Sequence, residues 1–232
     1  MTSMSAEARR REYLKALEID VYTKRGLGVE DETVGCDDGE REDDSLLDWD
    51  SLRQKVSNCT RCSLHQTRTQ TVFGVGSQSA DWMIIGEAPG AEEDRRGEPF
   101  VGRAGKLLDE MLRAVHLSRD SVFIANILKC RPPNNRDPSA TETASCRGYL
   151  ARQIELISPK IIVAVGRIAA QLLLETDAPL GSLRGKKHQL DDGQTPVIVT
   201  YHPAYLLRSP TQKRKAWQDL CLARQVMEEQ SQ

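Results

Sequence analysis

Short apolar runs alternate with amphipathic stretches from residue 82 onward. Residues 82–85, 122–125, 161–165 and 197–200 are almost entirely apolar, which predicts strands buried on both faces. Between them, residues 104–115, 141–157 and 168–174 repeat apolar positions at helical spacing and are predicted helices. This alternation predicts an α/β fold: a three-layer αβα domain around a central, four-stranded, mainly parallel sheet.

Polar segments follow the four predicted strands. They are GEAPG (86–90), NILKCRPPNNRDP (126–138), GRIAA (166–170) and YHPAYLLR (201–208). The carboxyl ends of parallel strands meet at one edge of a sheet, where open α/β proteins bind ligands. We therefore expect polar groups from the first, second and fourth segments to converge on a ligand there.

The N-terminal region differs from the rest in charge. Residues 1–50 hold 7 Lys/Arg and 15 Asp/Glu, a net charge of −8, whereas residues 51–232 hold 25 and 19, a net charge of +6. We expect a helix at residues 5–20, a flexible acidic linker at 29–44, and a main domain at 51–232. The basic balance of that domain fits an anionic partner such as nucleic acid about as well as a solvated enzyme surface.

The chain has no apolar stretch near the ~20 residues that a spanning helix needs, and it begins without the apolar core of a secretory signal. We expect a cytoplasmic protein without a membrane partner, whose six cysteines are thiols or metal ligands.

Four of the cysteines form a candidate metal site. Cys59 and Cys62 make a C-x2-C pair, and Cys130 and Cys146 have fifteen residues between them and lie in polar surroundings, where we judge burial improbable. A redox C-x2-C pair would normally open a helix after a strand, whereas this one precedes the first predicted strand. Four sulfurs suit either Zn(II) or an iron–sulfur cluster, and the spacing leaves both open. Cys36 and Cys221 are expected to be unligated.

The motifs CTRC, GEAPGAEED, GEPFVGRAGKLLDEML, NILKCRPPNNRDP, ETASCRGYL and HPAYLLR occur together and in this order. In this combination the chain resembles the family-four uracil-DNA glycosylases, over about residues 52–228. The resemblance implies a DNA repair enzyme that flips uracil out of DNA and hydrolyses its N-glycosidic bond, leaving an abasic site without a lyase step. It also implies that Cys59, Cys62, Cys130 and Cys146 hold a [4Fe-4S] cluster.

The resemblance assigns roles around the uracil ring. Gly86 permits close approach of a ligand to the backbone, and Glu87 stabilises the oxocarbenium-like sugar, orients water, or does both. Ala88 fills the neighbouring position, where some other uracil-DNA glycosylases have an aspartate. Phe100 stacks on the extruded base, and the Asn126 amide reads its pairing edge.

Further roles concern specificity, the leaving group and DNA. Glu93 matches the family residue that blocks the five-methyl group of thymine, and His202 donates a hydrogen bond to the departing uracil anion. Leu206 is the predicted wedge that fills the gap in the base stack, with Leu207 as its core companion. Arg184 and Arg208 are predicted DNA contacts. The full set of candidate phosphate contacts is Lys129, Arg131, Arg136, Arg184, Lys186, Lys187 and Arg208.

For single residues, purely structural interpretations remain open: Asn126 as a capping or turn residue, Phe100 as a core aromatic, and Leu206 and Leu207 as buried side chains. For the whole chain, the alternatives are a non-catalytic nucleic-acid-binding module with four cysteines, or a glycosylase that tolerates other deaminated bases. A related branch attaches itself covalently to the product sugar through a histidine in a basic loop that ends in RRIH. This chain lacks that loop, so we expect turnover. We expect a monomer whose partner is uracil-containing DNA.

Overall fold

The computed structural model describes residues 44–190, 193 and 195–230. The helix predicted at residues 5–20 and Cys36 lie outside the described residues, as does the predicted linker up to residue 43. The described residues belong to one compact unit, which spans residues 43–232.

The described part of this unit is built on a six-stranded sheet with strand order β1-β3-β2-β4-β6-β5. The four inner strands β3, β2, β4 and β6 are parallel, and β1 and β5 pair antiparallel at the two edges. The strands are β1 (Val75–Gly76), β2 (Trp82–Gly86), β3 (Phe123–Asn126), β4 (Ile161–Val165), β5 (Lys187–Gln189) and β6 (Pro196–Thr200). The four predicted strands are thus confirmed as the parallel centre. The edge strands were missed because two or three exposed or half-buried residues carry no apolar pattern.

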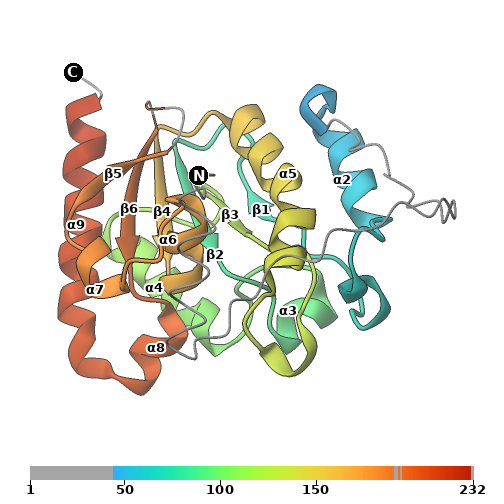
Figure 1. Cartoon of the computed structure of the whole chain (residues 1–232). Helices are drawn as coiled ribbons and strands as arrows, with labels where there is room; N and C mark the ends of the chain where they lie inside the picture. Colours follow the sequence, from blue (N-terminus) through green and yellow to red (C-terminus); the bar gives the residue numbers. More distant parts are fainter. Residues whose placement is uncertain (1–43, 191–192, 194, 231–232) are drawn as a thin grey trace, which may run out of the picture. The chain divides into compact units, whose positions relative to one another are not determined.

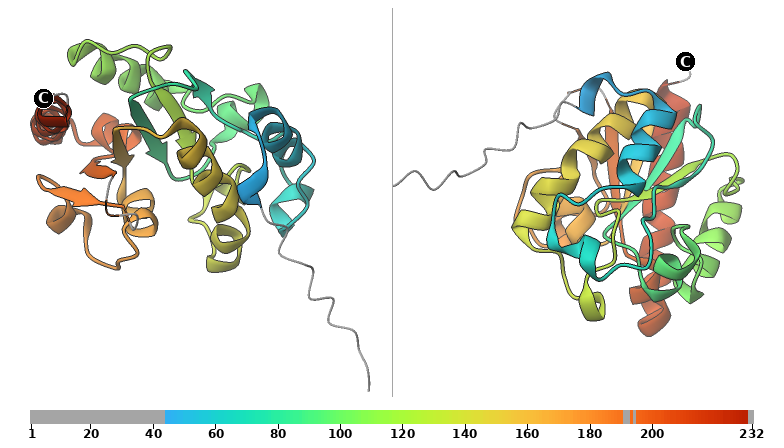
Figure 2. Two further views of the ribbon diagram at one scale, coloured as in Figure 1. Left: turned by 90° about the horizontal axis from the view of Figure 1, so that it is seen from above. Right: turned by 90° about the vertical axis from the view of Figure 1, so that its right-hand side faces the viewer.

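Helices cover both faces of the sheet, as predicted for three layers. The α-helices are α2 (Trp49–Ser57), α3 (Ala91–Arg96), α4 (Arg103–Ala114), α5 (Ala140–Ile157), α6 (Arg167–Leu173), α7 (Leu180–Leu183), α8 (Pro203–Arg208) and α9 (Lys213–Gln230). Short 3-10 turns are η1 (Asp44–Leu46), η2 (Ser63–Gln66), η3 (Pro133–Asn135) and η4 (Pro210–Gln212). Figure 1 shows α9 and α5 on either side of the strands. Seen from above, α4 and α9 lie on one face and α5, α6 and α7 on the other (Figure 2).

Along each inner strand, successive side chains point alternately into the two apolar cores on the two faces of the sheet. In β2, Met83 and Ile85 join the core under α5, α6 and α7, whereas Trp82 and Ile84 join the core under α4 and α9. All of these side chains are buried, because successive strand residues point to opposite faces and both faces are covered. The continuous apolar runs of the sequence follow from this double burial.

The three predicted helices correspond to α4, α5 and α6 within a residue at each end. The domain begins earlier than predicted, since α2 begins at Trp49 and the turn before it packs on the domain. Asp44 pairs with Arg61, and Arg152 donates to the carbonyl of Leu47 at 2.7 Å. Residues 44–50 are therefore part of the folded unit rather than of the linker.

The order in which strands are added to the sheet reverses at β2: β3 lies on one side of β2, and β4 and β6 lie on the other. The carboxyl ends of all four parallel strands meet at one edge, with Gly86 and Asn126 in register at the ends of β2 and β3. This switch point is where doubly wound sheets bind ligands. No helix in the described part of the chain is long and apolar enough to cross a membrane.

Candidate active site and four-cysteine site

Three predicted site residues lie in contact at the ends of β2 and β3. A Cβ atom added to Gly86 would lie 2.4 Å from Asn126 Oδ1 and 2.6 Å from Phe100 Cζ. Both side chains thus pack directly against the backbone of Gly86, and only glycine leaves them room. The Phe100 ring in turn lies 5.5 Å from the His202 ring, centroid to centroid. The structure brings four of the predicted residues together at one edge of the sheet.

The loop that carries Phe100 is held from several directions. Phe100 has a positive φ of 54°, which a non-glycine residue adopts only when its surroundings enforce it. Glu93 Oε1 accepts hydrogen bonds from the main-chain N–H groups of Val101 and Gly102, at 2.9 and 3.0 Å. Arg119, which the sequence reasoning missed, donates to the carbonyls of Phe100 and of the residue before it. These contacts fix the aromatic ring at the edge of the sheet, and Glu93 helps to hold the loop.

Asn126 is buried with an unused donor. Its side chain is 2% exposed, and no group in the described part of the chain accepts a hydrogen bond from Nδ2. Leaving a buried amide donor unpaired costs about 1–3 kcal/mol, so such groups normally find a partner. An incoming ligand with an acceptor would supply one.

His202 is held as a neutral imidazole in one tautomer. It lies at the end of β6 in extended conformation as the N-cap of α8, and its Nδ1 accepts a hydrogen bond from Ala204 N–H at 3.1 Å. Burial, with a smaller contribution from the nearby Arg208, lowers the pKa of His202 to about 4, against an opposing effect of Glu93. Because Nδ1 accepts, the single ring proton resides on Nε2, which is left as a donor.

Glu87 follows Gly86 directly and has a raised pKa. Burial is the main cause and Asp137 the second, and they raise the pKa of Glu87 to about 7 although Arg167 opposes the shift. Asp137 and Arg167 form an ion pair at 2.9 Å. Neither was a predicted site residue, although both lie in the segments that follow β3 and β4. Position after a strand end was the signal that could have identified them.

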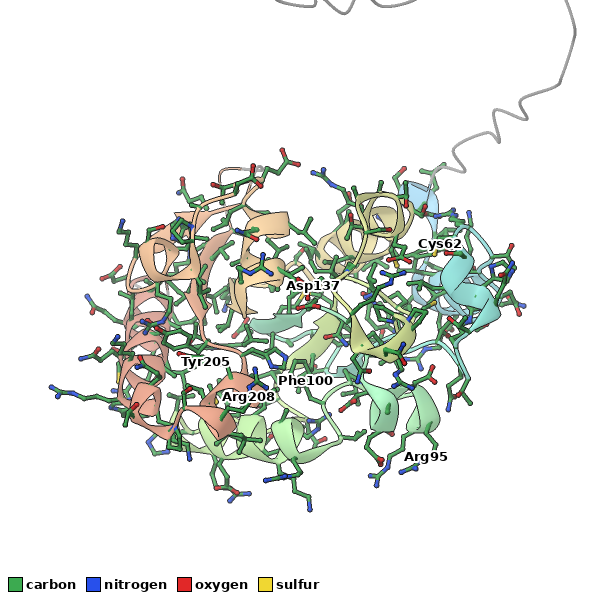
Figure 3. All side chains as sticks on the ribbon, turned by 60° about the horizontal axis from the view of Figure 1, so that its bottom comes forward. Cys62, Arg95, Phe100, Asp137, Tyr205 and Arg208 are labelled. Atoms are coloured by element: carbon green, nitrogen blue, oxygen red, sulfur yellow. The ribbon has the colours of Figure 1, made fainter. Side chains whose placement is uncertain are left out.

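The helix after His202 corrects one prediction. Leu206, the predicted wedge, is 1% exposed, whereas Leu207, the predicted core residue, is 38% exposed. A buried side chain cannot enter a base stack, so the structure contradicts both the predicted exposure of Leu206 and the predicted burial of Leu207. Tyr205 and Arg208 lie on the same helix, and Figure 3 shows both labels beside that of Phe100, with Cys62 well away from them.

Two predicted phosphate contacts are also wrong. Arg184 binds Asp219 through Nε and Nη2, at 2.8 and 2.6 Å, and its guanidinium covers the ring of Tyr201. Lys129 is 1% exposed, and its ammonium bonds inside the protein. Both charges are already used within the fold. Arg136 is partly engaged as well, since it pairs with Glu142.

The four-cysteine site (Cys59, Cys62, Cys130 and Cys146) forms one cluster although its members come from distant segments. Cys130 and Cys146 are buried, against our expectation, and Cys59 and Cys62 pack against the same apolar group. The prediction of exposed cysteines was based on their polar neighbours in the sequence. In the fold, residues such as Leu52, Leu64 and Leu128 cover Cys130 and Cys146, and Ala88 packs against this apolar cluster.

Donors surround the sulfurs of this site. Arg68 Nη1 donates to Cys130 Sγ at 3.0 Å and Nη2 to the Cys59 carbonyl at 2.8 Å, and the main-chain N–H of Lys129 donates to Cys146 Sγ at 3.3 Å. Burial raises the pKa of the Cys130 and Cys146 thiols, and these donors oppose that shift by favouring the thiolates. In the described residues, no three His, Cys, Asp or Glu side chains lie close enough to hold a single metal ion.

Comparison with known proteins agrees with this geometry. Residues 73–221 match the family described as the uracil DNA glycosylase superfamily. A type-4 uracil-DNA glycosylase from Archaeoglobus fulgidus is 45% identical over 167 residues, which are 69% of this chain and 84% of the relative. A type-4 uracil-DNA glycosylase from Pyrobaculum aerophilum is 42% identical, over 76% of this chain and 93% of the relative. Another, from Thermotoga maritima, is 44% identical, over 68% of this chain and 82% of the relative. The matched residues 73–221 include Cys130, Cys146 and the strand-end residues Glu87, Asn126 and His202, and the chain belongs to the uracil-DNA glycosylase superfamily.

Proposed function

We propose that this protein removes uracil from DNA by hydrolysing the N-glycosidic bond, and leaves an abasic site without a lyase step. The observation that carries the proposal is the buried, unpartnered Nδ2 of Asn126 beside the Phe100 ring. Glu87 and His202 follow strands that end at the same edge of the sheet. These four side chains offer an amide, an aromatic face, a carboxylate and a neutral imidazole to one extruded base.

Asn126 and Phe100 would bind the base. Uracil presents an acceptor at O4 and a donor at N3, so the amide can donate from Nδ2 and accept at Oδ1. Cytosine presents an amino donor in place of O4, which leaves Nδ2 facing another donor. Stacking of the base on an aromatic face contributes about 1–3 kcal/mol and compensates part of the stacking lost from the duplex.

His202 would stabilise the leaving group. Cleavage moves negative charge onto the uracil ring, and a preorganised donor aimed at the developing oxyanion lowers the barrier. The Nε2–H of the neutral ring is such a donor, and Nδ1 is held by Ala204 N–H so that the ring keeps its tautomer. A neutral donor keeps its proton, so uracil departs as an anion.

Glu87 would act on the sugar side of the bond. As a carboxylate, it stabilises the positive charge that develops on the sugar, and it can accept a proton from an attacking water. Ala88, next to it, supplies no second carboxylate. The raised pKa of Glu87 makes it a better base near neutral pH than an exposed glutamate would be.

We propose that the four-cysteine site holds a [4Fe-4S] cluster. The site is buried and apolar, and the ammonium of Lys129 beside it has no carboxylate partner among the described residues. A buried positive charge calls for a negative one nearby, which a group bound by four thiolates supplies. Cys59, Cys62, Cys130 and Cys146 would be its four thiolate ligands.

Bound there, the cluster would cross-link α2 and the segment after it to β3 and α5. Replacing Cys130 by serine should remove the visible absorbance and lower the unfolding temperature together. Cys221→Ser, which removes an exposed thiol, is the matched control. Retention of full stability without colour would contradict the structural role.

For DNA contact, Leu207 takes the wedge position and Arg208 is the phosphate contact that remains exposed beside the site. An apolar side chain inserted in the stack holds the gap from which the nucleotide has left. We propose that the protein is a cytoplasmic monomer. Sedimentation velocity tests its oligomeric state.

Excision of uracil from a synthetic strand with a single uracil tests the activity. The strand is incubated with protein and then treated with alkali, which cleaves abasic sites; wild type should cut it, and Asn126→Ala should lose at least about a hundredfold in rate. Asn134→Ala, at an exposed asparagine, is the control and should keep the wild-type rate. Retardation of the strand without cleavage would favour the non-catalytic module, and cutting at hypoxanthine or xanthine would favour broader base tolerance. Cleavage without alkali would contradict the absence of a lyase step.

A further inference from the structure

Lys129 lies in the protein interior between the candidate active site and the four-cysteine site. Its side chain is 1% exposed, and Nζ donates to the main-chain carbonyl of Asn126 at 2.9 Å and to Gln153 Oε1 at 2.6 Å. A lysine is almost never fully buried unless its ammonium is bound, because removing the charge from water is costly. The two hydrogen bonds explain how the ammonium is tolerated in the interior, but not why a lysine occupies this buried position.

The carbonyl of Asn126 requires a donor that the sheet does not provide. Ile127 N–H donates to Gly86 on β2, so the main-chain polar groups of Asn126 face the opposite side of β3, toward β1. Pairing with β1 ends at Ile124, two residues earlier. A buried carbonyl without a partner would be costly, and Lys129 Nζ supplies the missing donor from within the same turn.

The other contacts of Lys129 lead to the four-cysteine site. Its main-chain N–H donates to Cys146 Sγ at 3.3 Å, and the next residue is Cys130. Gln153, which accepts from Nζ, lies on α5 two turns after Cys146 and is 0% exposed. The Gln153 amide also donates to the Phe73 carbonyl at 2.9 Å, which anchors it.

We infer that Lys129 is a positioning residue that couples the four-cysteine site to the base-reading Asn126. The inference rests on the proposed function. One short segment carries Asn126 at its start and a cysteine ligand at its end, and the Lys129 side chain closes it into a fixed turn. The Lys129 ammonium fixes the backbone from which the amide reaches the base, and the four thiolates with the group they would hold would supply a negative charge beside it.

A double-mutant cycle tests this coupling. Single-turnover excision of uracil is measured for wild type, Lys129→Met, Asn126→Ala and the double variant. We expect Lys129→Met to lower the rate about tenfold in the wild-type background, because the Asn126 carbonyl loses its donor. In the Asn126→Ala background, where no amide remains to be positioned, the same change should cost less than about twofold.

Binding of free uracil gives a readout that does not depend on turnover. Calorimetry should show weaker binding by Lys129→Met than by wild type, by about the same factor as the rate. The visible absorbance per polypeptide reports the contents of the four-cysteine site. Lys160→Met is the matched control, since Lys160 is half exposed and pairs with Asp81. It should leave rate, binding and absorbance unchanged.

Gln153→Met keeps the test decisive if Lys129→Met does not fold. It removes one of the two acceptors that hold the ammonium and should lower the rate about threefold in the wild-type background, but not with Asn126→Ala. Equal losses in both backgrounds, for whichever variant folds, would overturn the coupling. An inactive wild type would instead refute the proposed function, so the two failures are distinguishable.

Discussion

The acid limb of the pH–rate profile should follow the ionisation of Glu87. The proposed mechanism uses this residue as a carboxylate, and burial with the neighbouring Asp137 raises its pKa from 4.5 to about 7. His202 adds no second limb near neutral pH, because burial lowers its pKa to about 4 and the ring stays neutral. Of the four side chains proposed to act on the base and the sugar, Glu87 is therefore the one that ionises between about pH 6 and 8.

The size of the effect follows from that pKa. With a pKa of about 7, roughly nine tenths of Glu87 is ionised at pH 8 and roughly one tenth at pH 6, so the rate should fall about tenfold. At the ordinary value of 4.5 the carboxylate would be about 97% ionised at pH 6, and the rate would change by only a few per cent. The two cases differ by far more than the error of a rate measurement.

Single-turnover excision with saturating protein is the appropriate assay, because the strength of DNA binding then does not enter the rate. Glu87→Gln should be slow, and its rate should not depend on pH over this range. Glu110→Gln, at an exposed glutamate paired with Arg113, is the matched control and should keep the wild-type profile.

Asp137→Asn removes the like charge that contributes to the raised pKa, so its acid limb should move to lower pH. A wild-type profile that is flat between about pH 6 and 8 would refute the reasoning, as would a limb that persists in Glu87→Gln.

Three further predictions concern packing and the corrected DNA contacts. Gly86→Ala should lower excision by at least about a hundredfold with little loss of folding, because the new methyl group displaces the Phe100 ring; circular dichroism checks the fold. Leu206→Ala should lower the free energy of unfolding in urea by about 2–5 kcal/mol, because it leaves a cavity. Leu207→Ala should leave the urea midpoint unchanged and slow excision from duplex DNA. The reverse pattern would support Leu206 as the wedge. Arg184→Ala should lower the free energy of unfolding by about 3–5 kcal/mol, because its partner Asp219 stays buried without a counter-ion. If the folded variant also bound DNA more than about twofold more weakly than wild type, Arg184 would be a phosphate contact after all.

The parallel centre of the sheet and three of its covering helices were predictable because they depend on local pattern. Runs such as residues 161–165 are apolar at every position, which only a doubly covered strand requires. The edge strands β1 and β5 and the 18-residue helix α9 were not predicted. The edge strands are short and partly exposed, and α9 is polar over much of its length, so neither carries a strong periodic signal.

For the site, residue types were predictable and partners were not. The sequence marks Asn126 and His202 as strand-end residues, but it contains nothing about the unpartnered Nδ2 of the one or the tautomer of the other. The prediction that Leu206 is exposed and Leu207 buried failed because a one-residue rotation on a short helix exchanges the two faces. Arg184 was assigned by its charge alone, and only the fold reveals its buried carboxylate partner.

By itself, the sequence determined the alternation of the four parallel strands with three of their helices, the carboxyl edge at which polar segments gather, and the four cysteines. These follow from periodicity and from the rule that parallel strands share a carboxyl edge. The tertiary structure alone decided which charges face solvent and which are used within the fold, as for the Lys129 ammonium, which bonds inside the protein. The physical reason is that burial, and with it the pKa of Glu87 and the pairing of each ion, depends on residues brought close by folding from distant positions in the chain.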